Sequence, residues 1–393
     1  MTPTDSSPPT ESAEAAPQFS PLHDAHVAAG ASFTDFAGWQ MPVRYTSDLA
    51  EHHAVRTAAG LFDLSHMGEI FVVGPAAAAA LDFALAGNAS AIAVSQAKYS
   101  LLLNRSGGIL DDLVVYRTGE DRFMVVANAA NRAVVADELR ARSAGFDAQV
   151  FDESADLALI AVQGPASLGI LQSLPGLAIE GGHPDGEDVA AALEQLRYYR
   201  CIAGLFGGQP ILFARTGYTG EDGFELYVSP DQSRELWDSL LEVGAERGLV
   251  PAGLASRDTL RLEAGMPLYG HELNAQTFPA QAGLGRVVNL SKATDFIGRQ
   301  ASEEGPNPDA PVLVGLTGEG KRAARAGYQV FDGDRQVGAV TSGALSPTLG
   351  HPIAMAYVAP ASARPATELT VDIRGSRQPF TVTQLPFYSR KKN

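Results

Sequence analysis

Apolar positions along most of the chain alternate between short runs that suit β-strands and longer, periodic runs that suit helices. In the first mixed section the pattern predicts strands at residues 69–73, 99–103, 113–116 and 123–127, and helices at 76–85 and 131–142. A second section predicts strands at 157–162, 211–215 and 224–228, and helices at 188–196, 231–247 and 256–264. Because strands often follow one another without a crossover helix, the pattern favours an antiparallel α+β fold.

The two ends of the chain carry different patterns. Residues 21–30 and 48–59 suit helices ended by Gly30 and Gly60, with a short strand and an aromatic-rich loop at 36–42 between them. An acidic, proline-bearing stretch at 303–311 looks like a linker. Beyond it, six apolar runs alternate with Gly and Pro turns, at residues 312–316, 328–331, 336–341, 353–358, 369–373 and 379–385. Such a series predicts a small all-β barrel.

Size and charge narrow the possible functions. A chain of 393 residues exceeds the size at which one core keeps growing, so two or three domains are expected. The formal charge of -16 disfavours general nucleic-acid binding, and the sequence offers no polybasic membrane footprint. Residues 1–17 have neither a basic start nor an apolar core, which predicts a disordered tail and not a signal peptide.

Cysteine and histidine usage argues against a metal centre. The single Cys201 excludes an intrachain disulfide and a cysteine metal cluster, and it suits a reducing compartment, so we expect a cytoplasmic location. The pairs His23/His26 and His52/His53 lack a His-Glu-x-x-His pattern, which predicts surface or capping positions and no metal site. His66 is a possible general base, but no serine or cysteine nucleophile is identifiable with it, so a structural role is favoured.

Two adjacent carboxylates offer the first candidate for catalysis. Asp111 and Asp112 follow a turn at Gly107 and Gly108 and lead into an apolar, β-rich run. Side chains alternate along a strand, so only one of the two acids can point into a buried cleft. A hairpin turn with an ordinary acidic residue is the alternative, and this segment alone favours it.

A glycine-rich loop at 215–223 leads into a strand that carries another candidate. Phe224, Leu226 and Val228 share one face of this strand, which leaves Glu225 on the other. Glu225 is therefore either solvated or held in a polar pocket. In a pocket, its two oxygens could accept hydrogen bonds from the adjacent amino and ring N–H donors of a pterin or guanine-like edge.

Two arginines share a face of the predicted helix at 256–264. Arg257 and Arg261 lie four residues apart, with Ser256 as the expected N-cap. Ion pairs with Asp258 or Glu263 are the ordinary explanation for both arginines. Binding of a ligand carbonyl or carboxylate is the alternative.

Eight segments form an ordered set along the chain. They are Asp35-Phe-Ala-Gly-Trp-Gln-Met-Pro, Phe62-Asp-Leu-Ser-His-Met-Gly, Gly107-Gly-Ile-Leu-Asp-Asp-Leu, Asn128-Ala-Ala-Asn, Arg215-Thr-Gly-Tyr-Thr-Gly-Glu-Asp-Gly-Phe-Glu, Arg257-Asp-Thr-Leu-Arg-Leu-Glu-Ala, Leu268-Tyr-Gly-His-Glu-Leu and Thr341-Ser-Gly-Ala-Leu-Ser-Pro-Thr-Leu-Gly. In this order and spacing they closely resemble the T proteins of the glycine cleavage system, which are aminomethyltransferases. The resemblance covers essentially all of residues 21–388.

This resemblance implies three domains arranged like a cloverleaf around a central folate site, the third being an antiparallel β-barrel. After the tail at 1–17, the expected domains are residues 18–67 with 155–270, residues 68–154 with 271–305, and residues 306–393. The implied reaction transfers the aminomethyl carbon from the lipoyl arm of the H protein to tetrahydrofolate. The products are ammonia, 5,10-methylenetetrahydrofolate and the dihydrolipoyl H protein, with no metal, nucleic acid or membrane involved.

The resemblance also assigns site residues. Its essential aspartate falls on Asp112, with Asp111 facing elsewhere; an ordinary carboxylate pKa of about 3.9 would leave Asp112 ionised, able to orient a folate amine or accept its proton. Folate contacts map onto Met67, Tyr99, Asp112, Val126, Asn128, Tyr218, Glu225 and Arg257. Met266 stands where some family members have a tyrosine, and the C-terminal tail is short. Candidates to hold the glutamate tail of folate are Arg390, Lys391 and Lys392.

Two related functions remain as alternatives. Folate-dependent demethylase or oxidase modules that act on methylated amines or sulfonium compounds share the implied fold and folate pocket, but the Asp111 and Arg257 segments resemble the glycine-cleavage branch more closely. Non-enzymatic folate-binding proteins that maintain iron–sulfur enzymes carry a Lys-Gly-Cys-Tyr-x-Gly-Gln-Glu segment. Cys201 lies instead in Tyr-Tyr-Arg-Cys-Ile-Ala, so the aminomethyltransferase is favoured.

Overall fold

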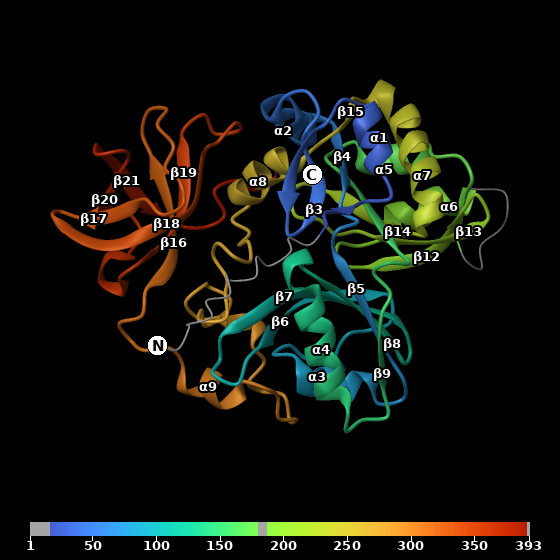
Figure 1. The fold of residues 1–393 in the computed structure, drawn as a ribbon, viewed down its shortest axis with the longest axis horizontal. Helices are drawn as coiled ribbons and strands as arrows, with labels where there is room; N and C mark the ends of the chain where they lie inside the picture. Colours follow the sequence, from blue (N-terminus) through green and yellow to red (C-terminus); the bar gives the residue numbers. More distant parts are fainter. Residues whose placement is uncertain (1–15, 180–186, 391–393) are drawn as a thin grey trace, which may run out of the picture.

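The computed structural model of the protein describes residues 16–179 and 187–390 and places three bodies side by side (Figure 1). A seven-stranded sheet with its helices lies next to a five-stranded sheet, and a closed barrel stands apart from both, beyond helix α8 (Leu254–Glu263). Residues 1–15, and with them most of the predicted disordered tail, fall outside the described residues. The α+β fold with a C-terminal barrel is as predicted.

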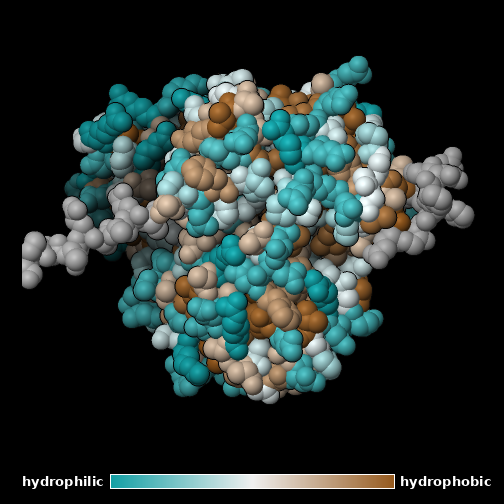
Figure 2. Space-filling view, turned by 45° about the vertical axis from the view of Figure 1, so that its right-hand side comes forward, coloured by the Kyte–Doolittle hydropathy of each residue, from teal (hydrophilic) through white to brown (hydrophobic). Residues whose placement is uncertain are grey.

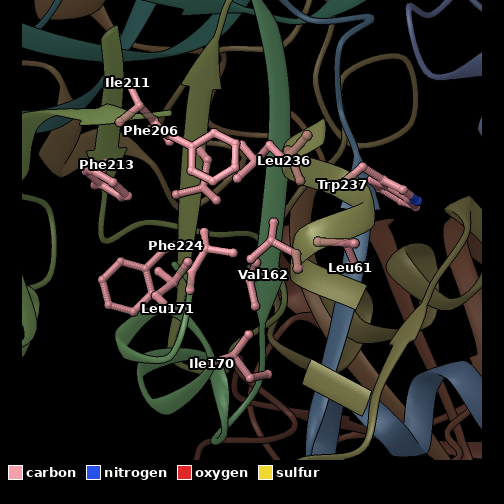
Figure 3. Close-up of a cluster of buried hydrophobic side chains, with 14 of the residues drawn as sticks. Leu61, Val162, Ile170, Leu171, Phe206, Ile211, Phe213, Phe224, Leu236 and Trp237 are labelled. Atoms are coloured by element: carbon pink, nitrogen blue, oxygen red, sulfur yellow. The ribbon is translucent and has the colours of Figure 1, made fainter. Parts of the chain in front are cut away.

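The seven-stranded sheet has the order β11-β12-β13-β14-β10-β4-β15 and is antiparallel except for the parallel pair β15 and β4. Its strands are β4 (Ala59–Asp63), β10 (Ala158–Gln163), β11 (Leu177–Ile179), β12 (Cys201–Phe206), β13 (Gln209–Ala214), β14 (Gly223–Val228) and β15 (Leu249–Pro251). The helices of this body are α1 (His23–Ala28), α2 (Asp48–Thr57), α5 (Ser167–Gln172), α6 (Glu187–Gln195) and α7 (Pro230–Gly244). Leu61, Val162 and Phe224 pack with Leu236 and Trp237 of α7 in one buried cluster (Figure 3).

The five-stranded sheet is antiparallel throughout, with the order β6-β7-β8-β5-β9. Its strands are β5 (Gly68–Val73), β6 (Gln96–Leu103), β7 (Ile109–Gly119), β8 (Arg122–Ala127) and β9 (Gln149–Asp152). Helices α3 (Ala77–Ala84) and α4 (Arg132–Ser143) pack on one face, where alternate residues such as Ile70 and Val125 are buried. The opposite face carries Phe71 and Tyr116, which pack against Phe62 and Tyr227 of the larger sheet. The two sheets therefore meet through a shared apolar layer.

The barrel closes in the order β16-β19-β18-β17-β20-β21, and each of the six apolar runs predicted in this region forms a strand. The strands are β16 (Val312–Gly318), β17 (Gln329–Asp332), β18 (Arg335–Leu345), β19 (Pro352–Val358), β20 (Glu368–Asp372) and β21 (Arg377–Thr383), preceded by α9 (Arg299–Glu304) and the predicted linker. Helix α8 joins the barrel to the rest of the protein: Leu262 packs on Ile353 and Met355, and Glu263 accepts hydrogen bonds from Ser346 and Thr348.

A small sheet near the N-terminus corrects one prediction. Strands β2 (Ser32–Phe36) and β3 (Trp39–Arg44) form a hairpin, with β1 (Gln18–Phe19) parallel to β3, where the sequence predicted a loop over 36–42. Ala37 and Gly38 both adopt positive φ angles, 54° and 84°, which make the tight turn. The aromatic residues at the turn therefore belong to strands.

Two predicted helix boundaries were also wrong. Helix α2 ends at Thr57, and Gly60 lies inside β4, where a Cβ atom would come within 2.5 Å of Val55 Cγ2. Helix α8 begins at Leu254 after Gly253, so Ser256 is not its N-cap, and Ser256 Oγ donates to the carbonyl of Gly253. Gly60 is required by close packing between α2 and β4 and not by a helix end, whereas Gly253 is the N-cap of α8 and also lies against the backbone of Val43.

The structure also contains elements that the sequence pattern did not predict, among them β1, β4, β9, β11, β12, β15, α5 and α9. His26 and His52 are fully buried, against the surface or capping positions predicted for them. Hydrophilic side chains cover most of the face drawn in Figure 2, with hydrophobic groups between them, as expected of an ordinary globular protein. Within residues 16–179 and 187–390, none of the helices has the length and apolar character needed to cross a membrane.

Candidate active site

A cavity of about 360 Å³ opens beside the apolar layer between the two sheets, and α8 with the segment after it completes the wall. Its lining residues lie between Phe36 and Leu284 in the sequence. The structure brings together on this wall all eight residues that the sequence assigned to the site: Met67, Tyr99, Asp112, Val126, Asn128, Tyr218, Glu225 and Arg257. Their individual roles stay predictions.

The acid pair on β7 is divided between two environments. Asp111 is fully buried and accepts hydrogen bonds from the side chains of Asn128 and Asn131 and from the Asn128 backbone. Asp112 points to the opposite face of the strand and lines the cavity. Its Oδ2 accepts a 3.0 Å hydrogen bond from the Tyr99 hydroxyl, and its Oδ1 accepts a 2.9 Å bond from Asn128 Nδ2. The alternation expected of a strand thus places one acid in the cavity.

Both acids differ from an ordinary carboxyl group in their affinity for protons. Burial raises the pKa of Asp112 to about 6, even though the hydrogen bonds from Tyr99 and Asn128 favour its ionised form. Burial, together with the adjacent charge of Asp112, raises the pKa of Asp111 to about 7. The expectation of an ordinary pKa for Asp112 was therefore wrong, and the pair changes its charge close to neutral pH.

Glu225 lies in a polar pocket and not on a solvated strand face. Thr216 Oγ1 donates a 2.5 Å hydrogen bond to Glu225 Oε2, and the Tyr116 hydroxyl donates to the same oxygen at 3.3 Å. Among the described residues no donor bonds Oε1, and Glu225 lines the cavity. One carboxylate oxygen is held in place while the other remains available to a ligand.

Arg257 and Arg261 differ, although they share a face of α8. Arg261 forms the ordinary ion pairs, with Asp258 at 2.7 Å and with the buried Glu272 at 2.9 Å. Arg257 forms no ion pair with any described residue, and its Nη1 is buried without a hydrogen-bond partner there. Its guanidinium lies 5.0 Å from the ring centre of Tyr218, and burial lowers its pKa. The geometry favours the ligand-binding alternative for Arg257.

The segment after α8 is held against the cavity by three hydrogen bonds. Tyr218 donates its hydroxyl to the carbonyl of Pro267, and Arg261 donates to the carbonyl of Met266 at 3.2 Å. Glu272 accepts from the Leu268 backbone at 2.9 Å. These contacts place Met266, Pro267 and Leu268 on the cavity wall.

Of the three candidates for the glutamate tail of folate, the structure describes Arg390 alone, and this residue is not part of the cavity wall. Arg390 forms an ion pair of 3.3 Å with Asp222, and neither residue lines the cavity. Lys391 and Lys392 lie outside the described residues.

Some residues at the site were not identified from the sequence. Tyr116 and Thr216 hold Glu225, and Asn131 holds Asp111. Tyr116 could have been found, because it lies four residues after Asp112 on the same face of β7. His66, for which a structural role was favoured, also lines the cavity. The described residues contain no group of three His, Cys, Asp or Glu that could hold a metal ion.

Both parts of the chain match models of known protein families. Residues 22–292 match the model of the GCVT N-terminal domain, and residues 312–389 match that of the glycine cleavage T-protein C-terminal barrel domain. The chain belongs to the glycine cleavage T-protein family. An aminomethyltransferase of Cutibacterium acnes is 57% identical over 370 residues, covering 94% of this chain and 98% of that protein. An aminomethyltransferase of Streptomyces avermitilis is 55% identical over 383 residues, covering 96% and 99%.

A solved structure agrees with these sequence matches. The glycine cleavage system aminomethyltransferase T of Bartonella henselae superimposes with a TM-score of 0.83 at 38% identity, covering 94% of this chain and 98% of that one. This T protein is thus an enzyme, an aminomethyltransferase of the glycine cleavage system, as the ordered sequence segments predicted.

Proposed function

We propose that this T protein transfers the aminomethyl carbon carried on the lipoyl arm of the H protein to tetrahydrofolate. The products are ammonia, 5,10-methylenetetrahydrofolate and the dihydrolipoyl H protein. The observation that carries the proposal is a single cavity that holds Asp112, with its raised pKa, together with the available oxygen of Glu225 and the unpaired guanidinium of Arg257.

The wall of the cavity suits a pterin. Glu225 Oε1 can accept from the amino and ring N–H donors of a pterin edge, because Thr216 and Tyr116 already hold Oε2. Arg257 Nη1 can donate to a ring acceptor, which would satisfy a buried cation that has no protein partner in the described part of the chain. Met67 and Val126 supply apolar surface for the ring face.

Asp112 is the group proposed to handle the proton. Tetrahydrofolate supplies two secondary amines that take up the methylene carbon. In the overall transfer two folate C–N bonds form, and the C–S bond to the lipoyl sulfur and the C–N bond to the departing ammonia break. The two amine protons end on ammonia and on the lipoyl thiol. With a pKa of about 6, Asp112 is mostly ionised at pH 7.5 and can accept an amine proton, while Tyr99 and Asn128 hold the carboxylate in position.

Supplying aminomethyl-loaded H protein and tetrahydrofolate to the purified enzyme tests the proposal directly. We expect ammonia and 5,10-methylenetetrahydrofolate to appear in equal amounts, and only when both substrates are present. If neither product forms with active, loaded H protein, the proposal fails.

We also propose the division into three domains and the cytoplasmic location that the sequence predicted. Each proposed domain contains a sheet of its own: the seven-stranded sheet falls within residues 18–67 and 155–270, the five-stranded sheet within 68–154, and the barrel within 306–393. The free, buried thiol of Cys201 supports a cytoplasmic location.

A further inference from the structure

His66 is a buried polar side chain that forms no hydrogen bond with any residue in the described part of the chain. It is 3% exposed, and its Nδ1 has no partner in the described part of the chain. Among residues 16–179 and 187–390, the other two buried histidines use both ring nitrogens. His26 bonds Asp63 at 2.8 Å and Tyr45 at 2.9 Å, and His52 bonds Thr259 at 2.7 Å and Thr348 at 2.9 Å. Because an unpaired buried polar group costs free energy, the difference calls for a reason outside the folded chain itself.

The surroundings of His66 indicate what that reason is. Its ring lines the same cavity as Glu225 and Arg257, and the ring of Phe36 holds it in place edge-on at 5.2 Å. Burial lowers the pKa of His66 to about 4; the charge of Asp63 opposes this shift and that of Arg257 adds to it. The imidazole is therefore neutral at physiological pH, with one ring nitrogen as donor and the other as acceptor.

We propose that a ring nitrogen of His66 forms a direct hydrogen bond with the pterin ring of bound tetrahydrofolate and so helps to orient the ring. The inference rests on the proposed function. Glu225 can only accept hydrogen bonds and Arg257 can only donate them, whereas a neutral imidazole can do either. His66 thus complements the other two groups around a ring whose edge carries both donors and acceptors. A charged imidazole would instead be repelled by Arg257.

The test compares His66→Leu, which fills the space without polar atoms, with His66→Gln, which keeps a donor and an acceptor. Two quantities are measured: the Kd for tetrahydrofolate, by fluorescence quenching under anaerobic conditions, and the Tm without ligand. We expect the leucine variant to bind about tenfold more weakly, with an unchanged or higher Tm because an unsatisfied buried group is gone. The glutamine variant should bind within about threefold of the parent protein. His53→Leu, at an exposed histidine, should change neither quantity.

Steady-state kinetics provide an independent criterion. If His66 binds the ring equally in the ground and transition states, its loss in the leucine variant should raise KM for tetrahydrofolate and leave kcat nearly unchanged. An unchanged Kd in the leucine variant would overturn the inference, and a lower Tm with an unchanged Kd would assign His66 a structural role. If the leucine variant does not fold, His66→Ala is judged by the same two quantities. If the parent protein itself does not bind tetrahydrofolate, the proposed function fails, so the two failures are distinguishable.

Discussion

Asn128 donates hydrogen bonds from one side-chain nitrogen to both acids of β7, 2.9 Å from Asp111 Oδ1 and 2.9 Å from Asp112 Oδ1. The two carboxyl groups lie on opposite faces of β7, yet this amide joins them at the edge of the cavity. The proton affinity and the orientation of Asp112 are therefore linked to a residue that the sequence assigned only to folate contact.

Asn128→Ala should shift the pH dependence of the reaction. In the parent enzyme, kcat/KM should fall as the pH drops through about 6, because Asp112 must be ionised to accept a proton. Loss of the Asn128 hydrogen bond removes a stabilising contact of the ionised form, so this acid limb should move up by about one pH unit. The exposed Asn307→Ala serves as the control and should leave the profile unchanged. An acid limb that stays in place would show that Asn128 does not tune Asp112.

Asp112→Asn should preserve folding and folate binding and lower the rate of 5,10-methylenetetrahydrofolate formation by about 10²- to 10⁴-fold, the usual contribution of a positioned base. Asp258→Asn is a matched control, because Asp258 lines the same cavity but pairs with Arg261. The rate is measured with loaded H protein, and the Tm reports folding. Turnover at the parent rate would remove Asp112 from the mechanism.

Glu225→Ala should weaken tetrahydrofolate binding by about tenfold or more, because a charged acceptor for two ring donors is lost. The Kd can be measured by calorimetry, with the exposed Glu235→Ala as the control. A Kd equal to that of the parent protein would exclude the pterin contact proposed for Glu225.

Glu69→Gln should stabilise the protein at alkaline pH. Glu69 lies on β5, is 1% exposed, and neither of its carboxyl oxygens has a hydrogen-bond partner in the described residues, so burial raises its pKa well above the usual value. Since the folded state retains this proton longer than the unfolded state, the parent protein loses stability as pH rises above about 4.5, by at most about 1.4 kcal/mol per pH unit for this group.

The Glu69→Gln variant has no carboxyl group at this position, so it does not lose stability in this way as the pH rises. Urea unfolding should therefore give it a higher free energy of unfolding than the parent protein at pH 8, and nearly the same value close to pH 4. Glu235→Gln, on the surface, should show no such difference. Equal stabilities at pH 8 would mean that Glu69 is ionised without cost in the folded protein.

Local alternation predicted which side chains of β7 and β14 lie on opposite faces, whereas most residues of the site were assigned from the family resemblance. The period of two along β7 and β14 separated Asp112 from Asp111 and Glu225 from Phe224, and six apolar runs predicted the barrel strands. The functions of these side chains could be assigned only from the ordered segments that resemble the T proteins. A strand pattern alone does not indicate which ligand a carboxylate binds in a cavity.

Contacts between segments that are distant in the sequence could not be predicted from local patterns of apolar and polar residues. Gly60 looks like a helix-end signal, yet it lies inside β4, where a Cβ atom would meet the Val55 side chain. Gly253 is needed because the backbone of Val43, far away in the sequence, approaches it closely. His52 is buried because Thr259 and Thr348, which are 207 and 296 residues away, take up its ring nitrogens. The raised pKa of Asp112 likewise depends on burial that only the packing of the sheets produces.

Helix α8 connects the cavity with the C-terminal barrel. Arg257 faces the cavity, while six residues later Glu263 is bonded to Ser346 and Thr348 of the barrel. Within the part of the chain that the structure describes, the barrel contributes no residue to the cavity lining, which runs from Phe36 to Leu284. Through α8 it nevertheless helps to position the Arg257 guanidinium. A substitution in the barrel that breaks the contacts of Glu263 should therefore shift Arg257 without any change in the residues that line the cavity.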